Sequence, residues 1–234
     1  ILYIHVKYSG VSGLFFLKIR LKYLHKKLGR GASQMGNRGQ HFRGNGTTGI
    51  LLSLFIVFFM SAVWAYDYSG GAGTALSPYQ ISNKSDLKYL SENASEWSKH
   101  FIQTADIVFE TADFQSGGDF YNGGEGWRTI GTEASSFLGL YDGGGHTISG
   151  LFINRPTNDM QGMFGYADSG SIIRNLGLIN INVKGRTYVG GLFGLFSGTV
   201  NNCYAVGIVS STDFVGGLIG LNSGTVSGCY AECM

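Results

Sequence analysis

The sequence has few of the residues that cross-link or stiffen small exported domains. It contains three cysteines and two prolines in 234 residues. Cys203, Cys229 and Cys233 are too few and too unevenly spaced for a disulfide framework. No histidine lies near them in the sequence, so a cysteine-based metal site is not indicated.

Motifs for two common chemistries are also absent. A zinc peptidase needs two His and one Glu on one helix face, to hold the metal and activate water. No His-Glu-x-x-His stretch occurs, and the five histidines are scattered: His5, His25, His41, His100 and His146. No lysine stands where a phosphate-binding loop requires it. The sequence therefore predicts neither chemistry within these residues.

Acidic residues are missing from the first 65 positions, which carry nine Lys or Arg. Residues 66–234 carry the other eight basic residues and all fifteen acidic ones, a net charge of −7. Such an abrupt change in charge predicts two separate segments rather than one folded domain. Phosphate would repel the acidic second segment, which argues against nucleic acid as a partner.

One long apolar run is present, at residues 50–65, after Arg38 and Arg43. A membrane-spanning helix needs about 20 apolar residues, more than this run has. Its end suits signal-peptidase cleavage between Ala65 and Tyr66. We expect residues 35–65 to be a secretory signal peptide that directs the protein outside the cell or to its surface. An uncleaved N-terminal anchor is the alternative.

Residues 1–34 precede Met35, at which we expect translation to begin. We interpret them as a spurious or disordered extension without function. A basic amphipathic membrane helix at residues 13–28 is the alternative.

Two near-identical segments lie near the C-terminus, at residues 189–205 (VGGLFGLFSGTVNNCYA) and 215–231 (VGGLIGLNSGTVSGCYA). They align without a gap, and self-similarity at a fixed period of this length is typical of a solenoid. Earlier apolar segments extend the pattern. Equivalent positions can be placed at Leu151, Leu176, Cys203 and Cys229, whose numbers rise by 25, 27 and 26. We therefore predict an all-β fold, a parallel β-helix over residues 137–234 with repeats at 189–214 and 215–234.

The repeated residues have structural interpretations. We expect the repeated glycines to occupy coil corners whose backbone conformations penalise a side chain. Leu192, Val200 and Ala205 would point inward, whereas Tyr204 and Tyr230 would form an outward ladder. Cys203 and Cys229 would lie one coil apart as buried thiols, with a disulfide as the alternative. The shared positions are Gly190, Gly191, Leu192, Gly194, Gly198 and Cys203, with Gly216, Gly217, Leu218, Gly220, Gly224 and Cys229.

Residues 66–136 predict a cap for the first coil, because a solenoid's terminal coil exposes unpaired backbone groups. A strand at residues 78–82 precedes Asn83 and Asp86, which resemble a capping box. Leu87, Leu90, Ala94 and Trp97 follow at helical spacing, with an interruption near Asn93. Residues 101–108 then alternate as a second strand.

A glycine-rich loop at residues 114–131 contains Phe120, Tyr121 and Trp127. Such rings could stack on sugars if they were displayed. We expect them instead to fold onto the first coils, because exposed aromatic area is costly.

The stretches VGGLFG, GTVNNCYA, VGGLIG and GTVSGCYA resemble the GLUG-motif repeat of bacterial secreted and surface proteins. Residues 138–153 (LGLYDGGGHTISGLFI) are similar to the opening coil of β-helix proteins in that group, and the resemblance covers roughly residues 72–234. It implies a right-handed parallel β-helix, export and an adhesin-like role, with no catalytic residue. Some relatives join such repeats to a secreted zinc peptidase, whose motif is missing here.

The function predicted is an exported repeat scaffold that binds glycans or surface proteins and needs no cofactor. The last coil stops partway, so we expect the chain to be truncated at its C-terminus. The alternatives are the non-catalytic repeat region of a larger secreted peptidase, or a β-helix polysaccharide lyase or glycoside hydrolase. The weak catalytic candidates of such a lyase or hydrolase are Asp142, His146, Asp119 and Glu125, with Asp113 nearby. Asp142 lies in a glycine-rich turn that favours a short polar side chain for structural reasons, and calcium at these acidic turns remains an option.

Overall fold

A computed structural model describes residues 2–9, 16–23 and 68–234, in two compact units, 1–65 and 66–234. The first unit contains an antiparallel hairpin of β1 (Leu2–Ser9) and β2 (Phe16–Tyr23). The helical alternative for residues 13–28 is therefore wrong over 16–23. The predicted signal peptide and the cleavage point at Ala65 and Tyr66 lie outside the described residues.

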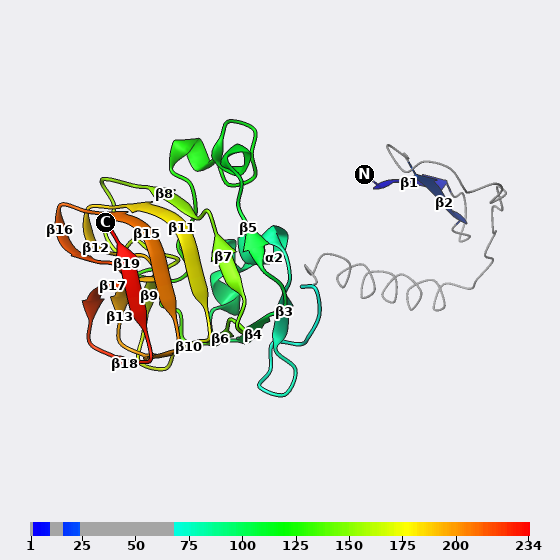
Figure 1. Cartoon of the computed structure of the whole chain (residues 1–234). Coiled ribbons are helices and arrows are strands. Elements are labelled where there is room, and N and C mark those ends of the chain that lie inside the picture. The colour runs from blue at the N-terminus through cyan, green and yellow to red at the C-terminus, as the bar shows by residue number, and fades with distance from the viewer. Residues whose placement is uncertain (1, 10–15, 24–67) are drawn as a thin grey trace. The chain divides into compact units, whose positions relative to one another are not determined.

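Residues 68–234 form stacked parallel sheets, as predicted (Figure 1). One six-stranded sheet contains β3 (Tyr79–Ile81), β4 (His100–Gln103), β6 (Leu140–Asp142), β10 (Ile172–Arg174), β14 (Thr199–Asn201) and β18 (Thr225–Ser227). A second contains β5 (Ile107–Val108), β7 (Thr147–Ser149), β11 (Gly177–Lys184), β15 (Tyr204–Ser210) and β19 (Tyr230–Cys233), with β8 (Phe152–Asn154) on β11. Two smaller sheets complete the coils: β9 (Phe164–Ala167), β13 (Phe193–Phe196) and β17 (Ile219–Asn222), and β12 (Thr187–Gly190) with β16 (Asp213–Gly216). The solenoid is a parallel β-helix.

The strand register gives the true length of each coil. Tyr141 pairs with Ile173, Ile173 with Val200, and Val200 with Val226, so the residue number rises by 32, then 27, then 26. The step of 25 placed between Leu151 and Leu176 is wrong. Thr147 of β7 pairs with Gly177 and Phe152 of β8 pairs with Asn182, so both strands lie 30 residues before their partners in β11. This longer second coil is the reason for the wrong step. The register shift between Leu178 and Ile181 lies instead in the pairing of β11 with β15.

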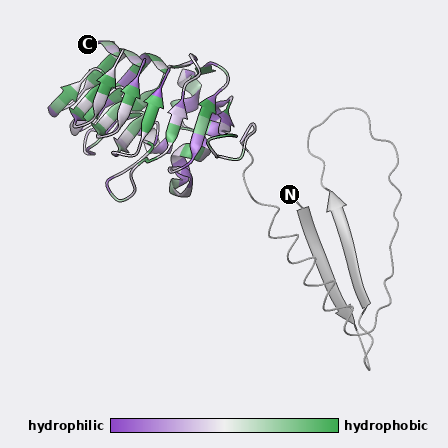
Figure 2. Cartoon of the chain, turned by 90° about the horizontal axis from the view of Figure 1, so that it is seen from below, coloured by the Kyte–Doolittle hydropathy of each residue, from purple (hydrophilic) through white to green (hydrophobic). Residues whose placement is uncertain are grey.

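The core is a set of stacked apolar columns. Phe101, Tyr141, Ile173 and Val200 lie on successive coils of the first sheet and are all fully buried. Leu192, Cys203 and Ala205 are also buried, so the predicted inward positions of the third coil are confirmed. Hydrophobic residues gather on the stacked strands and hydrophilic ones on the loops and the helical end (Figure 2). Burial of these columns drives folding.

The outward tyrosine ladder is as expected, and the cysteine ladder is so in part: Cys203 is buried, but Cys229 is only half-buried. Tyr204 and Tyr230 stack with ring centroids 5.0 Å apart and planes at 5°. The three cysteines are free thiols. The Cys203 N–H lies 3.4 Å from the Cys229 sulfur on the next coil. Burial raises the pKa of the Cys203 thiol to about 12.

The repeated glycines are required for a different reason from the one predicted. Positive φ angles occur at other positions and at none of the repeated glycines. The constraint is close approach: a Cβ on Gly191 would lie 2.6 Å from Cδ1 of Ile181 and 2.7 Å from the carbonyl oxygen of Gly217. On Gly194 it would lie 2.4 Å from the Met160 backbone. Adjacent coils pack against these bare backbones, which leaves no room for a methyl group.

The N-terminal cap forms largely as predicted. The Asn83 side chain accepts hydrogen bonds from the N–H groups of Ser85 and Asp86 and begins α2 (Lys84–Glu92). The Asp86 carboxylate accepts from the Ser82 N–H, so a reciprocal bond to the Asn83 N–H is not the one that forms. The helix ends at Glu92, and η1 (Ala94–Glu96) follows. α2 lies at the end of the solenoid beside β3 (Figure 1).

Of two expectations for the segment after the helix, one is wrong and the other is largely confirmed. Residues 101–108 make two strands in different sheets, β4 and β5, because the chain turns a corner at residues 104–106. A single strand there was wrong. In the glycine-rich loop, which contains η2 (Thr111–Phe114) and η3 (Asn122–Gly124), Phe120 and Trp127 are buried, and Tyr121 is 36% exposed. Phe120 and Trp127 therefore fold inward as expected, whereas Tyr121 does not.

Candidate functional site

Asp142 ends strand β6 and is bound by its own turn. Its carboxylate accepts hydrogen bonds from Nε of Arg174 at 2.8 Å, the amide of Asn175 at 3.0 Å and the Gly144 N–H at 3.0 Å. Partial burial opposes its ionisation, but these three donors together hold the pKa of Asp142 below its ordinary value. A carboxylate engaged by three donors stabilises the turn and the stacking of β6 on β10.

His146 lies in the same glycine-rich turn but faces a different carboxylate. Its Nδ1 is 3.4 Å from Oδ1 of Asp106. Asp106 also accepts from the Thr147 N–H, which is the main cause of the lowered pKa of Asp106. This cluster joins the corner between β4 and β5 to the next coil.

The acidic residues of the loop pair with cations of other elements. Lys84 of α2 binds Asp113 at 2.8 Å, and Lys88 reaches Asp119 at 4.0 Å. Glu125 binds Arg155 at 2.7 Å. The loop is thus tied to the helix at one side and to the second coil at the other.

Within residues 68–234, no hydrogen bond or ion pair joins any two of Asp142, His146, Asp119 and Glu125. That part of the chain also contains no group of three or more His, Cys, Asp or Glu that could hold a metal ion. Each candidate carboxylate instead lies within ion-pair distance of a basic side chain.

A groove of about 390 Å³ lies elsewhere, in the range of small-molecule sites. Residues 128–133 of the loop and 155–161 before β9 form most of its wall, beside Ser91 and Trp97 of the cap. Both segments bridge to neighbouring coils, through Ile130 to Phe164 and Gln161 to Val189. Strand pairing on either side therefore fixes the distance across the groove.

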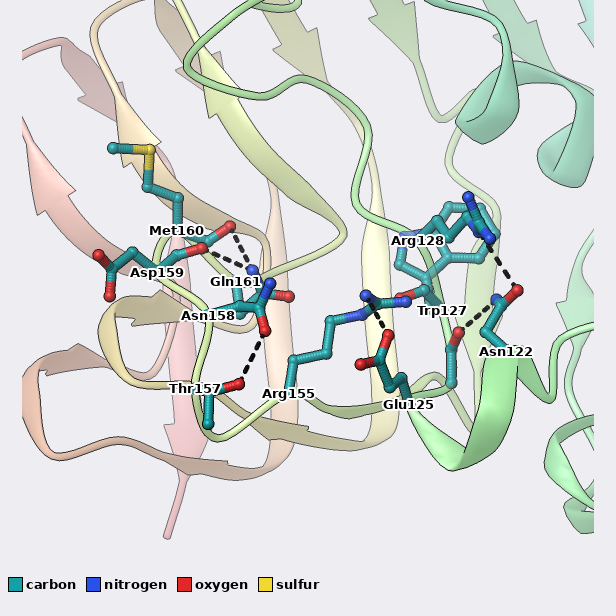
Figure 3. A network of polar contacts seen from close by, with 11 residues as sticks. Asn122, Glu125, Trp127, Arg128, Arg155, Thr157, Asn158, Asp159, Met160 and Gln161 are labelled. Atoms are coloured by element: carbon teal, nitrogen blue, oxygen red, sulfur yellow. Dashed lines mark hydrogen bonds and ion pairs between the residues drawn. The ribbon is translucent and has the colours of Figure 1, made fainter.

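Arginines dominate one end of the groove (Figure 3). Arg155 binds Glu125, and its Nε donates to the backbone oxygen of Trp127 at 3.2 Å. Burial lowers the pKa of Arg155; Glu125 opposes this shift, and the charge of Arg128 adds to it. Arg128 donates to the amide oxygen of Asn122 at 3.2 Å and makes no ion pair among the described residues. Two guanidinium groups and one carboxylate leave a surplus positive charge.

The other end of the groove carries the amides of Asn158 and Gln161 beside Asp159 (Figure 3). Asp159 binds Arg186 at 2.6 Å, and this hydrogen bond holds the pKa of Asp159 below its ordinary value. Gln161 is 5% exposed, and its Nε2 donates to the backbone oxygens of Asp159 and Met160. Its Oε1 is buried without a hydrogen-bond partner. An unsatisfied buried acceptor usually has a functional or structural reason.

Sequence reasoning missed this groove. Arg128 and Arg155 lie far apart in the sequence, on different coils, and the segment at 155–161 carries no repeat signature. Arg155 and the mainly polar residues 157–161, which follow β8, were the available signal. Only the coil register shows that they face residues 128–133.

Comparisons with known proteins give two relatives. The chain is 36% identical to halomucin of Haloquadratum walsbyi over 146 residues, which is 61% of this chain and 2% of that protein. It is 35% identical over 138 residues to a protein of Evansella cellulosilytica named as a Gly-rich membrane protein, covering 58% of this chain and 15% of the relative. The chain therefore spans a small part of either relative. No family model matches, and no solved structure matches.

Among the described residues, no helix is long and apolar enough to span a bilayer. The apolar run at 50–65 lies outside those residues.

Proposed function

We propose that the protein is an exported, GLUG-like repeat scaffold at the cell surface that binds glycans in the groove between residues 128–133 and 155–161. The observation that carries this proposal is the unused hydrogen-bonding capacity of residues that line this groove: Arg128 makes no ion pair among the described residues, and Oε1 of Gln161 has no hydrogen-bond partner there. Sugar hydroxyls both donate and accept hydrogen bonds, so they can pair with such unused groups. Similarity to halomucin and to a Gly-rich membrane protein supports a surface location.

The groove of this rigid scaffold is better suited to binding glycans than the acidic turns are to catalysis. A glycosidase needs two carboxylates facing one bond at about 5 to 9.5 Å. Asp142 and Glu125 each bind an arginine, and these pairs stabilise contacts between coils. Function is argued from a site rather than from the fold, and the groove is the site with free hydrogen-bonding capacity.

The test is binding of the full chain to an array of neutral and acidic glycans, with a parallel assay for released reducing ends or unsaturated sugars. We expect reversible binding without release. The paired variant Asp142→Asn, Asp119→Asn should bind as the parent does, because both residues lie outside the groove lining. No binding to any glycan would overturn the proposal, and a protein partner would then be the ligand to seek. Released product that disappears in the paired variant would establish an enzyme instead.

A further inference from the structure

The two ends of the groove differ in what they lack. The arginine end lacks an anion, because Glu125 can neutralise only one of Arg128 and Arg155. The amide end lacks a donor for Gln161 and leaves the side-chain nitrogen of Asn158 without a hydrogen bond among the described residues. A ligand that completes both ends must bring an anionic group and hydroxyls together.

We propose that the groove selects acidic sugars of the uronate class, with the ligand carboxylate on Arg128 and ring hydroxyls at Gln161 and Asn158. This rests on the proposed glycan-binding function. A planar guanidinium binds a carboxylate through two parallel hydrogen bonds, a geometry that neutral hydroxyls do not reproduce. The donor set of Arg128 is open for this, because its one described contact is the amide oxygen of Asn122.

Charge repulsion in the empty groove supports an anionic ligand. Arg128 lies close enough to Arg155 to oppose its charged form, and Arg155 is half-buried and its side chain only 14% exposed. A carboxylate placed at Arg128 would offset this repulsion.

Glu133 is the group that opposes this inference. It lines the groove and makes no ion pair within residues 68–234. Its charge would repel a uronate at long range, but Glu133 and Arg128 are both exposed, so solvent and salt screen the repulsion by one and the attraction by the other alike. Asp159 does not contribute comparably, because Arg186 neutralises it.

At the amide end, Oε1 of Gln161 is buried and has no hydrogen-bond partner among the described residues. Nε2 is fixed by two backbone oxygens, at 2.6 and 3.2 Å, which sets the orientation of the amide. A hydroxyl is a suitable donor because it can accept from the Asn158 amide at the same time.

The experiment uses the full chain and two probes that differ only in charge: an oligogalacturonate and its methyl ester. We measure both dissociation constants by calorimetry at low and high salt. The acid should bind at least about tenfold more tightly than the ester at low salt, as a charge-assisted hydrogen bond requires. The preference should shrink as salt increases.

Two groove variants separate the two halves of the proposal. Arg128→Gln should abolish the preference for the acid and leave ester binding unchanged. Gln161→Met should weaken the binding of both probes equally, because it removes only the hydrogen bond to a ring hydroxyl. Arg174→Gln is the matched control, since it removes an arginine that pairs with Asp142 outside the groove lining, and it should leave both constants unchanged. Thermal melts establish that each variant is folded.

The outcomes distinguish this inference from the function on which it rests. Equal binding of acid and ester, or an acid preference that survives Arg128→Gln, overturns selection for uronates but leaves glycan binding intact. Absence of binding by both probes and by every neutral glycan overturns both proposals.

Discussion

The Tyr141 hydroxyl on β6 donates to Oε1 of Gln103 on β4 at 3.1 Å, inside the core. Nε2 of the same glutamine donates to the backbone oxygens of Ala105 and Thr147. This fully satisfied polar cluster secures the corner at residues 104–106, where the chain passes from the first sheet to the second.

Tyr141→Phe should destabilise the protein by about 1–3 kcal/mol, the usual cost of leaving a buried acceptor unpaired. Gln103→Leu should lower the free energy of unfolding further, because it leaves the backbone oxygens of Ala105 and Thr147 without their amide donor. In the Gln103→Leu background, the added cost of Tyr141→Phe should be smaller, since no acceptor remains to be orphaned. Urea unfolding of the four proteins measures the coupling, and additive costs would contradict this view of the corner.

Leu192→Asp should unfold the third coil, because it places a charge at a fully buried position. Thr199→Asp, on the partly exposed side of β14, should shift the free energy of unfolding by no more than about 0.5 kcal/mol. Thermal melts compare the two variants. Equal tolerance at both positions would contradict the inward and outward register described for this coil.

Gly191→Ala should destabilise by about 1–3 kcal/mol through overpacking against Ile181 and the Gly217 carbonyl. Gly170→Ala is the control: it has no positive φ, and its nearest neighbour would lie 3.5 Å away. That variant should be neutral or stabilised by up to about 1 kcal/mol, because the unfolded chain loses freedom. Equal destabilisation of both would contradict close approach as the reason for Gly191.

Stability should decline with alkaline pH through Cys203. Burial raises its pKa to about 12 from the ordinary value of 9.0, so the unfolded chain releases this proton first. Its contribution to stability is therefore present below pH 9 and is lost progressively as pH rises towards 12. Melting temperatures between pH 7 and 10.5 should fall less steeply for Cys203→Ala than for the parent. Cys203 should also resist alkylation in the native protein at pH 8.

Glu133→Gln should raise affinity for the oligogalacturonate and leave affinity for its methyl ester unchanged. The substitution removes a repulsive charge from the groove lining without altering Arg128 or Gln161. Calorimetry at low salt is the measurement, because screening reduces the difference at high salt. Weaker binding of the acid would show that Glu133 helps to hold the ligand, contrary to the arrangement proposed.

The sequence predicted the features that depend on local or repeated residue patterns. It did not predict the features that depend on the register between neighbouring coils. Spacing predicted the solenoid, and the alternation around Val200 and Cys203 predicted which side chains are buried. The helix at Asn83 was predicted because a capping residue acts within one turn. The corner at residues 104–106 and the bulge after Leu178 were missed, since neither has a residue pattern independent of the neighbouring coil.

The groove could not be predicted for the same reason. Arg128 and Gln161 line the same groove because Phe164 of β9 pairs with Ile130. This pairing is long-range and has no local sequence signal. The role assigned to the repeated glycines was half correct: the positions matter, but through the space between coils rather than through their φ angles.

The parallel register of the last coils has a consequence for how such a protein can change. Because Val189 pairs with Val215 and Phe193 with Ile219, one repeat unit can stack on an identical copy. Each added unit would lengthen the rod by about 4.8 Å, the spacing of hydrogen-bonded strands. The groove lies near the opposite end, on coils that such a duplication would not touch. The length of the solenoid and the ligand specificity of the groove can therefore evolve separately in this architecture.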